Sequence, residues 1–336
     1  MAIRRFRRRR LRDRHRFRQR FRLQDMTDDE LRQRYRFSRA SIFYILGIVS
    51  RFLARPTRRS HAVPPVLQLL AALRFFATGS FMRLVGDSVG LSEASVCRSV
   101  FRVACGLASK AKDFIKMPRQ ERAQAAKEKF YRLSRFPNVL GAIDCTHVKI
   151  QAPTDNEGDY VNRKGYHSIN VQMVCDADYQ FTNCVAEWPG CVHDARVFRN
   201  SRLRDAMENG QYNGLLVGDS AYPCRPFLMT PFNQPASEKE RRFNNSLCRA
   251  RVFIEQSFGI LKRRFPCLQV GLRMSPERAA LVTLACVVLH NIAMLLNEPL
   301  DDSTEEPDLG NDASNVLLPD RNDGAGIRRH LCENYF

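Results

Sequence analysis

The chain has 336 residues, and 44% of them are apolar, so it is long enough to bury a substantial core in one large domain or two ordinary ones. Lysine and arginine exceed aspartate and glutamate by 19; residues 1–22 carry +11, residues 298–336 carry −7, and the body between them carries +15. A basic body predicts a polyanionic partner, and we favour nucleic acid over a membrane surface. Eleven cysteines without a C-x-x-C pair argue against a disulfide framework and a zinc ribbon, and they are typical of a reducing compartment.

The chain begins with an Arg-rich arm, residues 1–26, in which arginine alternates with phenylalanine, leucine and histidine. We predict that this arm is disordered. It is either a solvated basic tail or a segment for nuclear import or for contact with DNA phosphates. We favour the second interpretation and therefore expect a nuclear protein.

Residues 27–116 are predicted to form an all-α domain. Thr27 and Glu30 have the spacing of a capping box, and the apolar segments 41–54 and 64–79 have the length of helices. In residues 80–103 two helical patterns meet at a glycine, and a serine follows that can cap the second helix. This is the outline of a helix-turn-helix, although an ordinary helical hairpin has the same pattern.

A helix-turn-helix would turn the polar face of its second helix toward the DNA major groove. That face comprises Glu93, Ala94, Ser95, Arg98 and Arg102. Residues 117–137 are predicted to be a connector, a polar helix followed by a proline-bearing stretch, that leads to a second domain.

From residue 138 the pattern changes to strands. We predict strands over 138–150, 168–177, 180–188 and 215–220, because each stretch is either apolar throughout or alternates apolar with polar residues. A helix is expected from about residue 193, and a second one over 246–265. The second helix has an apolar stripe made of Leu247, Ala250, Ile254, Phe258, Leu261 and Phe265. The predicted fold class is therefore α/β or α+β, with helices that flank a sheet.

The longest apolar run covers residues 279–296. It is barely long enough to span a bilayer, and His290 and Asn291 interrupt it. We therefore predict a buried core helix in which these two residues form a hydrogen-bonded pair, and we expect no membrane partner. Residues 298–336 are predicted to be an acidic tail.

Three acids stand out by their positions. Asp144 lies in the middle of an apolar strand, Asp219 ends the buried strand LLVGD, and Glu255 borders the apolar stripe of its helix. Each acid alone has an ordinary explanation: backbone hydrogen bonds for Asp144, a turn for Asp219, and an ion pair with Arg251 for Glu255.

Together, the three acids favour a shared divalent site. Hard ions such as Mg²⁺ or Mn²⁺ prefer carboxylate oxygens. Two such ions would activate a water molecule or a 3′-hydroxyl and stabilise the departing oxygen in phosphodiester displacement. A basic chain around an acidic metal site is what a nuclease needs, because the ions offset the repulsion between carboxylates and phosphates.

The sequence resembles the catalytic domain of PIF/Harbinger-type transposases and of the host nucleases derived from them. The segments that carry the resemblance are GAIDCTHVKI, YVNRKGYHSINVQMVCD, WPGCVHDARVFRNS, LLVGDSAYP and RVFIEQSFGILKRRF, and the likeness covers about residues 36–296 in order. It implies an RNase H-like fold over 138–297 and an Asp-Asp-Glu metal triad that maps onto Asp144, Asp219 and Glu255.

The resemblance also implies a cut-and-paste function. Such enzymes excise DNA at transposon ends and reinsert it at A/T-rich targets, with help from a Myb/SANT-like protein that aids nuclear entry; without it the enzyme can stay cytoplasmic. We expect a homodimer or a larger assembly by analogy. A non-catalytic DNA-binding or scaffold protein that keeps the fold is the alternative function.

Several neighbouring residues match the family pattern with less certain roles. His193 and Asp194 open a helix and either cap it or support the metal ligands. Asn162, Arg163 and Lys164 lie in a basic loop that is either a solvated turn or a contact with the DNA backbone. His147 alternates away from Asp144 along the strand, and we interpret it as structural.

Overall fold

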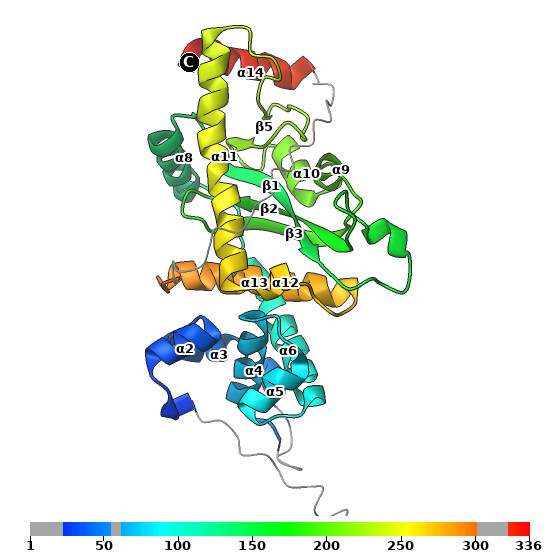
Figure 1. Cartoon of the computed structure of the whole chain (residues 1–336). Coiled ribbons are helices and arrows are strands. Elements are labelled where there is room, and N and C mark those ends of the chain that lie inside the picture. The colour runs from blue at the N-terminus through cyan, green and yellow to red at the C-terminus, as the bar shows by residue number, and fades with distance from the viewer. Residues whose placement is uncertain (1–22, 55–61, 301–321) are drawn as a thin grey trace, which may run out of the picture.

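A computed structural model describes residues 23–54, 62–300 and 322–336 of the chain (Figure 1). Residues 1–22 lie outside this range, so the predicted disorder of the arm is tested only at its end. There the prediction is wrong, because Leu23–Asp25 forms a short 3₁₀-helix and Met26 is buried. The folded part thus begins inside the segment that the sequence assigned to the arm.

The N-terminal unit is helical, as predicted. It contains α2 (Asp28–Tyr35), α3 (Arg39–Leu53), α4 (Pro65–Phe76), α5 (Met82–Val89), α6 (Glu93–Ala108) and the short α7 (Ala111–Phe114). The capping box at the start of α2 is confirmed, since Thr27 and Glu30 each bond the other's backbone N–H. Helix α6 lies at the centre of this unit and packs against α3, α4 and α5.

Helices α5 and α6 form the two arms of the predicted helix-turn-helix outline. Gly90 ends α5 with φ 71°, a left-handed conformation that favours glycine, and Ser92 accepts a hydrogen bond from the backbone of Ser95 at the start of α6. Gly86 is needed as well, because a Cβ there would lie 2.5 Å from the carbonyl oxygen of Leu91. Arg98 is exposed and Arg102 is half-buried on α6. Their contact with DNA stays a prediction.

In the described part of the chain the strands form one five-stranded mixed sheet with the order β3-β2-β1-β4-β5. Its members are β1 (Val139–Lys149), β2 (Ser168–Cys175), β3 (Phe181–Pro189), β4 (Leu215–Val217) and β5 (Leu228–Met229). β1 and β3 pair antiparallel with β2, whereas β4 pairs parallel with both β1 and β5. The first four strands were predicted, and β5 was not, because two residues carry no periodic signal.

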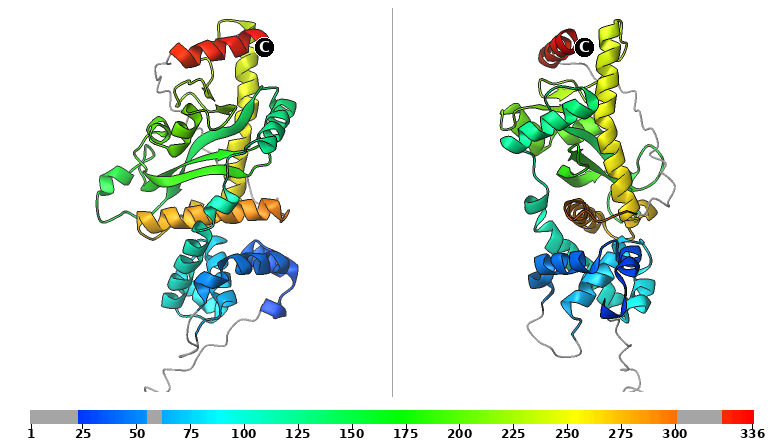
Figure 2. Two further views of the ribbon diagram at one scale, coloured as in Figure 1. Left: turned by 180° about the vertical axis from the view of Figure 1, so that it is seen from behind. Right: turned by 90° about the vertical axis from the view of Figure 1, so that its left-hand side faces the viewer.

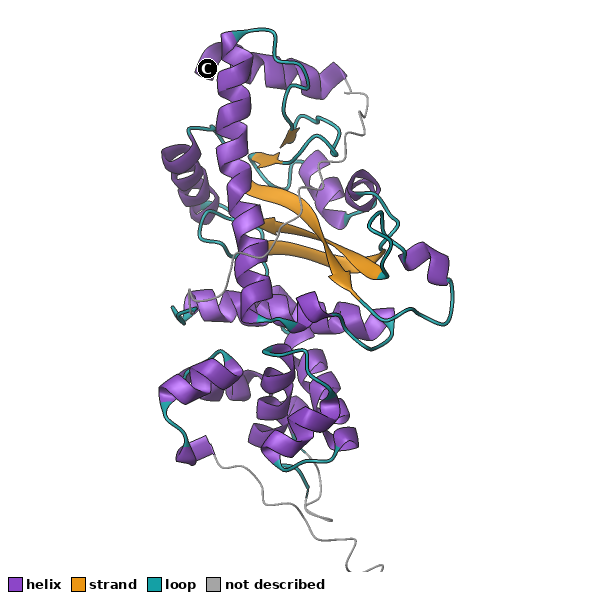
Figure 3. Cartoon of the chain, viewed as in Figure 1, coloured by secondary structure: helices purple, strands orange, loops and turns teal. Residues whose placement is uncertain are grey.

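Helices cover both faces of the sheet (Figure 3). On one face lies α11 (Glu238–Arg264), whose predicted apolar stripe is buried, and α13 (Pro276–Leu295) runs along the β3 side. On the other face the single helix expected from residue 193 is two helices, α9 (Asp194–Arg199) and α10 (Arg202–Glu208). They break at Ser201, whose hydroxyl caps α10 by accepting a hydrogen bond from the backbone of Arg204.

One further helix confirms the polar helix predicted within residues 117–137, and another lies where the sequence predicted only an acidic tail. α8 (Glu121–Ser134) packs against β1 and α11, with Phe130 edge-on to Phe253 at 5.5 Å, so it lies with the sheet. α14 (Asn322–Tyr335) packs against α11 and β5 near the C-terminus (Figure 2). The packing of α8 on the sheet and the existence of α14 were not predicted, because both helices are polar on most of their surface.

Helix α13 lies between the helical unit and the sheet, against α6 on one side and β3 on the other. The predicted core helix is confirmed: α13 is long and apolar enough to span a membrane, but most of it is buried in the protein. His290 donates from Nε2 to the carbonyl of Tyr179 at 2.8 Å. Asn291 bonds the backbone of Phe181 and Phe114. These two polar residues therefore fix the position of the apolar helix along β3 and α7.

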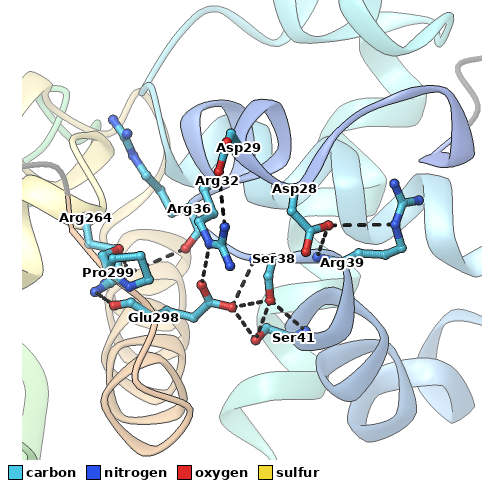
Figure 4. A network of polar contacts seen from close by, with 10 residues as sticks. All are labelled: Asp28, Asp29, Arg32, Arg36, Ser38, Arg39, Ser41, Arg264, Glu298 and Pro299. Carbon is cyan, nitrogen blue, oxygen red and sulfur yellow. Dashed lines mark hydrogen bonds and ion pairs between the residues drawn. The ribbon is translucent and has the colours of Figure 1, made fainter.

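A buried polar network joins the helical unit to the residues that follow α13 (Figure 4). The Glu298 side chain, only 4% exposed, accepts hydrogen bonds from the Ser38 backbone at 3.0 Å, from Arg32 at 3.3 Å and from the hydroxyls of Ser38 and Ser41. Arg264, 1% exposed at the end of α11, donates to the backbone carbonyl of Glu298 at 2.9 Å. The predicted acidic tail thus begins inside the folded protein, and its first acid fixes the helical unit to α11.

The buried imidazole of His290 predicts sensitivity to acid. Burial lowers the pKa of His290 from 6.5 to about 4, so the unfolded chain binds the proton first. Stability should fall by roughly 3 kcal/mol as the pH drops from about 7 to 4, since one pKa unit corresponds to about 1.4 kcal/mol. In His290→Gln, which keeps a donor for Tyr179, this part of the acid loss should vanish. Urea unfolding across this pH range measures it.

The matched control for this measurement is His330→Gln on α14, where the side chain is exposed. The control should follow the wild-type pH profile. If His290→Gln follows it too, His290 does not contribute to the acid sensitivity of the fold.

Candidate functional site

Asp144 stands near the centre of β1, with Met173 of β2 as its cross-strand partner. The residue keeps some solvent exposure, but protein atoms surround its carboxylate. Oδ1 accepts a hydrogen bond from the Cys145 backbone at 2.7 Å, which orients the group. Burial, and after it the charge of Asp219, raise the pKa of Asp144 to about 8, although Arg251 opposes the increase. The carboxylate is therefore held in an unfavourable environment that lacks a full counter-charge.

Asp219 lies beside Asp144 because of the register of two parallel strands. Ala142 of β1 pairs with Val217 of β4, and each acid follows two residues later on its own chain. Gly218, between the strand and Asp219, leaves room for the ring of Tyr222, since a Cβ there would lie 3.1 Å from it. The Asp219 carboxylate accepts a hydrogen bond from the Ala221 backbone at 3.0 Å. Burial raises its pKa, and Asp194 and Glu255 add to the increase.

Glu255 approaches the two aspartates from α11. Its side chain is 45% exposed and pairs with Arg251 one turn earlier, where Nη2 lies 3.3 Å from Oε1. The ion pair that the sequence offered as the ordinary explanation for Glu255 is therefore present. The same Arg251 lowers the pKa of both Asp144 and Asp219, so one guanidinium faces all three acids.

The donor set fits a hard divalent ion in its chemistry. The three predicted acids supply oxygen ligands. Burial raises the pKa of both aspartates and neighbouring acids add to the increase, and a bound cation would relieve the repulsion among the acids. Across residues 23–54, 62–300 and 322–336, however, no three acidic, histidine or cysteine side chains converge closely enough to hold an ion as they stand. Glu255 faces Arg251 instead.

Of the two residues predicted to support the site at the start of α9, Asp194 lies with the acids as a fourth carboxylate, and His193 does not. Asp194 opens α9, accepts a hydrogen bond from Asn170 of β2 at 2.8 Å, and raises the pKa of both Asp144 and Asp219. His193 is the residue that precedes α9, and its ring hydrogen-bonds with Arg163 of the basic loop. The structure thus brings Asp194 to the acids and directs His193 toward the loop.

The three predicted residues of the basic loop between β1 and β2 differ in exposure and therefore in what they can contact. Asn162 is 5% exposed; its carbonyl oxygen accepts from the Lys164 backbone at 2.9 Å and its amide donates to Ser168 at 3.0 Å. It shapes the turn and has little surface for DNA, which corrects the expectation for this residue. Arg163 and Lys164 are exposed. The structure does not bring Arg98 and Arg102 to the acids; they lie on α6, across α13 (Figure 1).

Two residues that sequence reasoning missed fasten the elements of the site together. Lys262 of α11 donates from Nζ to Thr146 Oγ1 at 2.7 Å and to the carbonyl of His147 at 3.4 Å, next to Asp144 on β1. Burial and the nearby Lys164 lower the pKa of Lys262 to about 8. Tyr222, buried after Asp219, lies with its hydroxyl 3.4 Å from Cys145 Sγ. The sequence does hint at Lys262, because it follows Glu255 by two helical turns and so lies on the same face of the helix. Within the basic run KRR, however, nothing distinguishes it from Arg263 and Arg264.

Comparison with known proteins agrees with this geometry. Residues 143–291 match a family described as DDE superfamily endonuclease. The chain is 40% identical over 303 residues to the human protein named "Putative nuclease HARBI1", which covers 87% of each chain. The chain belongs to the DDE superfamily endonucleases.

More distant relatives extend the family beyond vertebrates. The Protein ALP1-like of Arabidopsis thaliana is 28% identical over 293 residues, 80% of this chain and 71% of that protein. The "Probable transposase for insertion sequence element IS702" of Microchaete diplosiphon is 23% identical over 239 residues, 65% of this chain and 78% of that protein. No solved structure matches the chain. The predicted family is thereby confirmed, and this DDE endonuclease has a mixed sheet consistent with it.

The crowded carboxylates predict an unusual stability effect. Asp144→Asn should raise the melting temperature of the metal-free protein, because an amide replaces a carboxyl group whose ionisation is disfavoured by burial and by the charges of Asp219 and Asp194. The gain should be on the order of 1–2 kcal/mol. Millimolar Mg²⁺ or Mn²⁺ should stabilise the wild type but not the variant. Thermal unfolding with EDTA and with each ion measures both effects.

Asp113 is exposed on α7, and Asp113→Asn is the control for the loss of a charge alone. It should change the melting temperature little, both in EDTA and with Mg²⁺ or Mn²⁺. A decrease in melting temperature for Asp144→Asn without metal would show that the carboxylate stabilises the fold and is not held there against its own repulsion.

Proposed function

We propose that this chain is a DNA endonuclease of the transposase type, with an RNase H-like catalytic domain. Asp144, Asp219 and Glu255 would hold two divalent ions, Mg²⁺ or Mn²⁺, for phosphodiester hydrolysis and strand transfer at transposon ends. The observation that carries the proposal is the parallel register of β1 and β4, which sets two half-buried aspartates side by side opposite α11.

The bound ions would supply an activated oxygen nucleophile and neutralise charge on the phosphate. The chain itself supplies rigidity and orientation. The backbone N–H groups of Cys145 and Ala221 fix the rotamers of Asp144 and Asp219, while Lys262 fastens α11 to β1. These contacts hold the two aspartates firmly in place, and only the Glu255 side chain must turn to join them.

We propose that DNA lies along the basic side of the site. Arg163 and Lys164 are exposed on the loop that follows β1, and His193 hydrogen-bonds Arg163 from the start of α9. Arg98 and Arg102 on α6 would contact DNA in the helical unit, and the Arg-rich arm would add phosphate contacts. A nuclear location, a Myb/SANT-like partner and a homodimer or larger assembly belong to this proposal by family analogy.

The catalytic assignment is tested by cleavage of DNA that carries candidate inverted-repeat ends. Each of Asp144→Ala, Asp219→Ala and Glu255→Ala should lower the rate on the order of 100-fold or more, because each removes a ligand. Gel assays of nicking and strand transfer in Mg²⁺ and in Mn²⁺ measure this. The exposed Asp113→Ala is the control and should match the wild type. Three variants that cleave like the wild type would refute the metal site.

A scaffold function is the alternative that the same assay decides. In the described structure Glu255 is engaged by Arg251, and this would be a resting arrangement for an enzyme but a permanent one for a scaffold. Wild-type protein that binds DNA ends and never nicks them with any divalent ion would favour the scaffold.

DNA affinity should fall steeply with salt, because phosphate contacts release counterions. Arg163→Met and Lys164→Met should each weaken binding and reduce the slope of log K against log salt by about 1. The control is Lys239→Met at the start of α11, where the ammonium bonds the carbonyl of Glu333 beside α14. Fluorescence anisotropy between 50 and 300 mM salt, roughly the range where such slopes are measured, gives both numbers. A flat salt response in the wild type would refute DNA binding by the basic body.

A further inference from the structure

We propose that Arg251 is the internal counter-ion of the carboxylate site, and that a divalent cation binds there only by displacing its guanidinium from Glu255. The inference rests on the proposed metal-dependent function and adds to it a residue that competes with the ions. It also makes a claim about the metal-free protein that stands without catalysis.

The position of Arg251 supports this role. It lies on α11 one turn before Glu255, with a side chain that is 20% exposed, and it faces the two aspartates of β1 and β4. Its guanidinium interacts with Asp144, Asp219 and Glu255, and Asp194 adds a further negative charge beside the two aspartates. Lys262, the other half-buried cation on this side of α11, donates to Thr146 and His147 and not to these acids. Arg251 therefore carries most of the compensating charge while no ion is bound.

The guanidinium is held loosely for such a central group. Its hydrogen bond from Nη2 to Glu255 measures 3.3 Å, whereas charged pairs of this kind usually lie at about 2.7–2.9 Å. Its Nε is buried and has no hydrogen-bond partner among the described residues. The order along the helix is also the weaker one, because an acid placed four residues before a base is favoured over the reverse. Each of these features makes the guanidinium easy to displace.

Arginine and a metal ion cannot share this site. A guanidinium keeps its proton at any accessible pH, so it cannot give up its charge when an ion arrives. A divalent ion among the same carboxylates would repel it at close range. Glu255 must also turn from Arg251 to reach an ion with the two aspartates, since no three acids converge while the pair is formed. The two cations therefore occupy alternative states of one site, and the ion binds against the energy of the arginine state.

The first test uses protein without metal. Arg251→Met should lower the melting temperature in EDTA, because it leaves the acids without a counter-charge. Arg249→Met, an exposed arginine on the same helix, removes the same charge and should have little effect. In an Asp144→Asn background the loss caused by Arg251→Met should shrink by half or more, since the buried charge it compensates is gone. An undiminished loss in that background would overturn the counter-ion role.

The second test measures ion binding directly by Mn²⁺ electron paramagnetic resonance. Arg251→Met should bind Mn²⁺ with a half-saturating concentration about tenfold or more lower than the wild type, because no arginine must be displaced. Arg249→Met should match the wild type, and Asp144→Asn should lose the binding. Equal or weaker Mn²⁺ binding by folded Arg251→Met would overturn the displacement.

A third variant guards against misfolding. Arg251→Lys keeps the charge on a shorter reach, and circular dichroism should show it folded with an intermediate Mn²⁺ affinity. If no variant and no wild type binds Mn²⁺, the metal-dependent function fails and displacement fails with it, while the EDTA experiment still decides the counter-ion role. If all bind and Arg251→Met gains nothing, the metal-dependent function stands and this inference alone is wrong.

Discussion

The constraint on which the site depends is the parallel pairing of β1 with β4. It aligns Ala142 with Val217 and so places Asp144 and Asp219 side by side, two residues further along each chain. Burial disfavours ionisation of both groups, and neighbouring acids add to the effect, which is why the pKa values of both aspartates rise. A fold that keeps this arrangement must supply a cation nearby. Arg251 supplies it from the protein, and a divalent ion would supply it in the proposed reaction.

The third acid depends on a different structural element, the 27-residue helix α11. Its apolar stripe fixes the rotation of the helix about its axis, and Lys262 fixes its position along β1 through Thr146. Phe253 packs against Phe130 of α8, and Phe258 packs against Phe181 of β3, so these rings position α11 against α8 and the sheet. Glu255 and Arg251 need no contacts of their own to be placed correctly. The contacts that Phe253, Phe258 and Lys262 make on the same helix determine where the two side chains point.

Much of this architecture was predictable from the sequence because it is local. Residue spacing alone predicts three of its features, and the structure confirms each of them: the capping box at Thr27, the apolar strand around Asp144 and the apolar stripe of α11. The two acids on strands were singled out for the same reason, since a carboxylate within an apolar run is a local anomaly.

What the sequence did not reveal depends on distant partners. β5 is a strand only because β4 pairs with it, and α8 joins the core only because α11 and β1 offer it a surface. Asn162 was assigned to DNA contact because its basic neighbours suggest it, but Ser168 and the Lys164 backbone occupy its amide. Arg251 was noted only as an ordinary partner for Glu255. Its position opposite two aspartates becomes visible only when the sheet and the helix are assembled.

The helical unit is connected to the site through the end of α11. Arg264 ends the helix that carries Glu255, and it bonds the backbone of Glu298, whose carboxylate is held by Ser38 and Arg32 of the helical unit. A buried acid with this many donors is costly to separate from them, so the network joins the two parts firmly. Helix α13 adds an apolar contact with α6 over its length. DNA bound at α6 would therefore meet the carboxylates at a fixed distance, so the position of a cut relative to a binding site would be set by the fold.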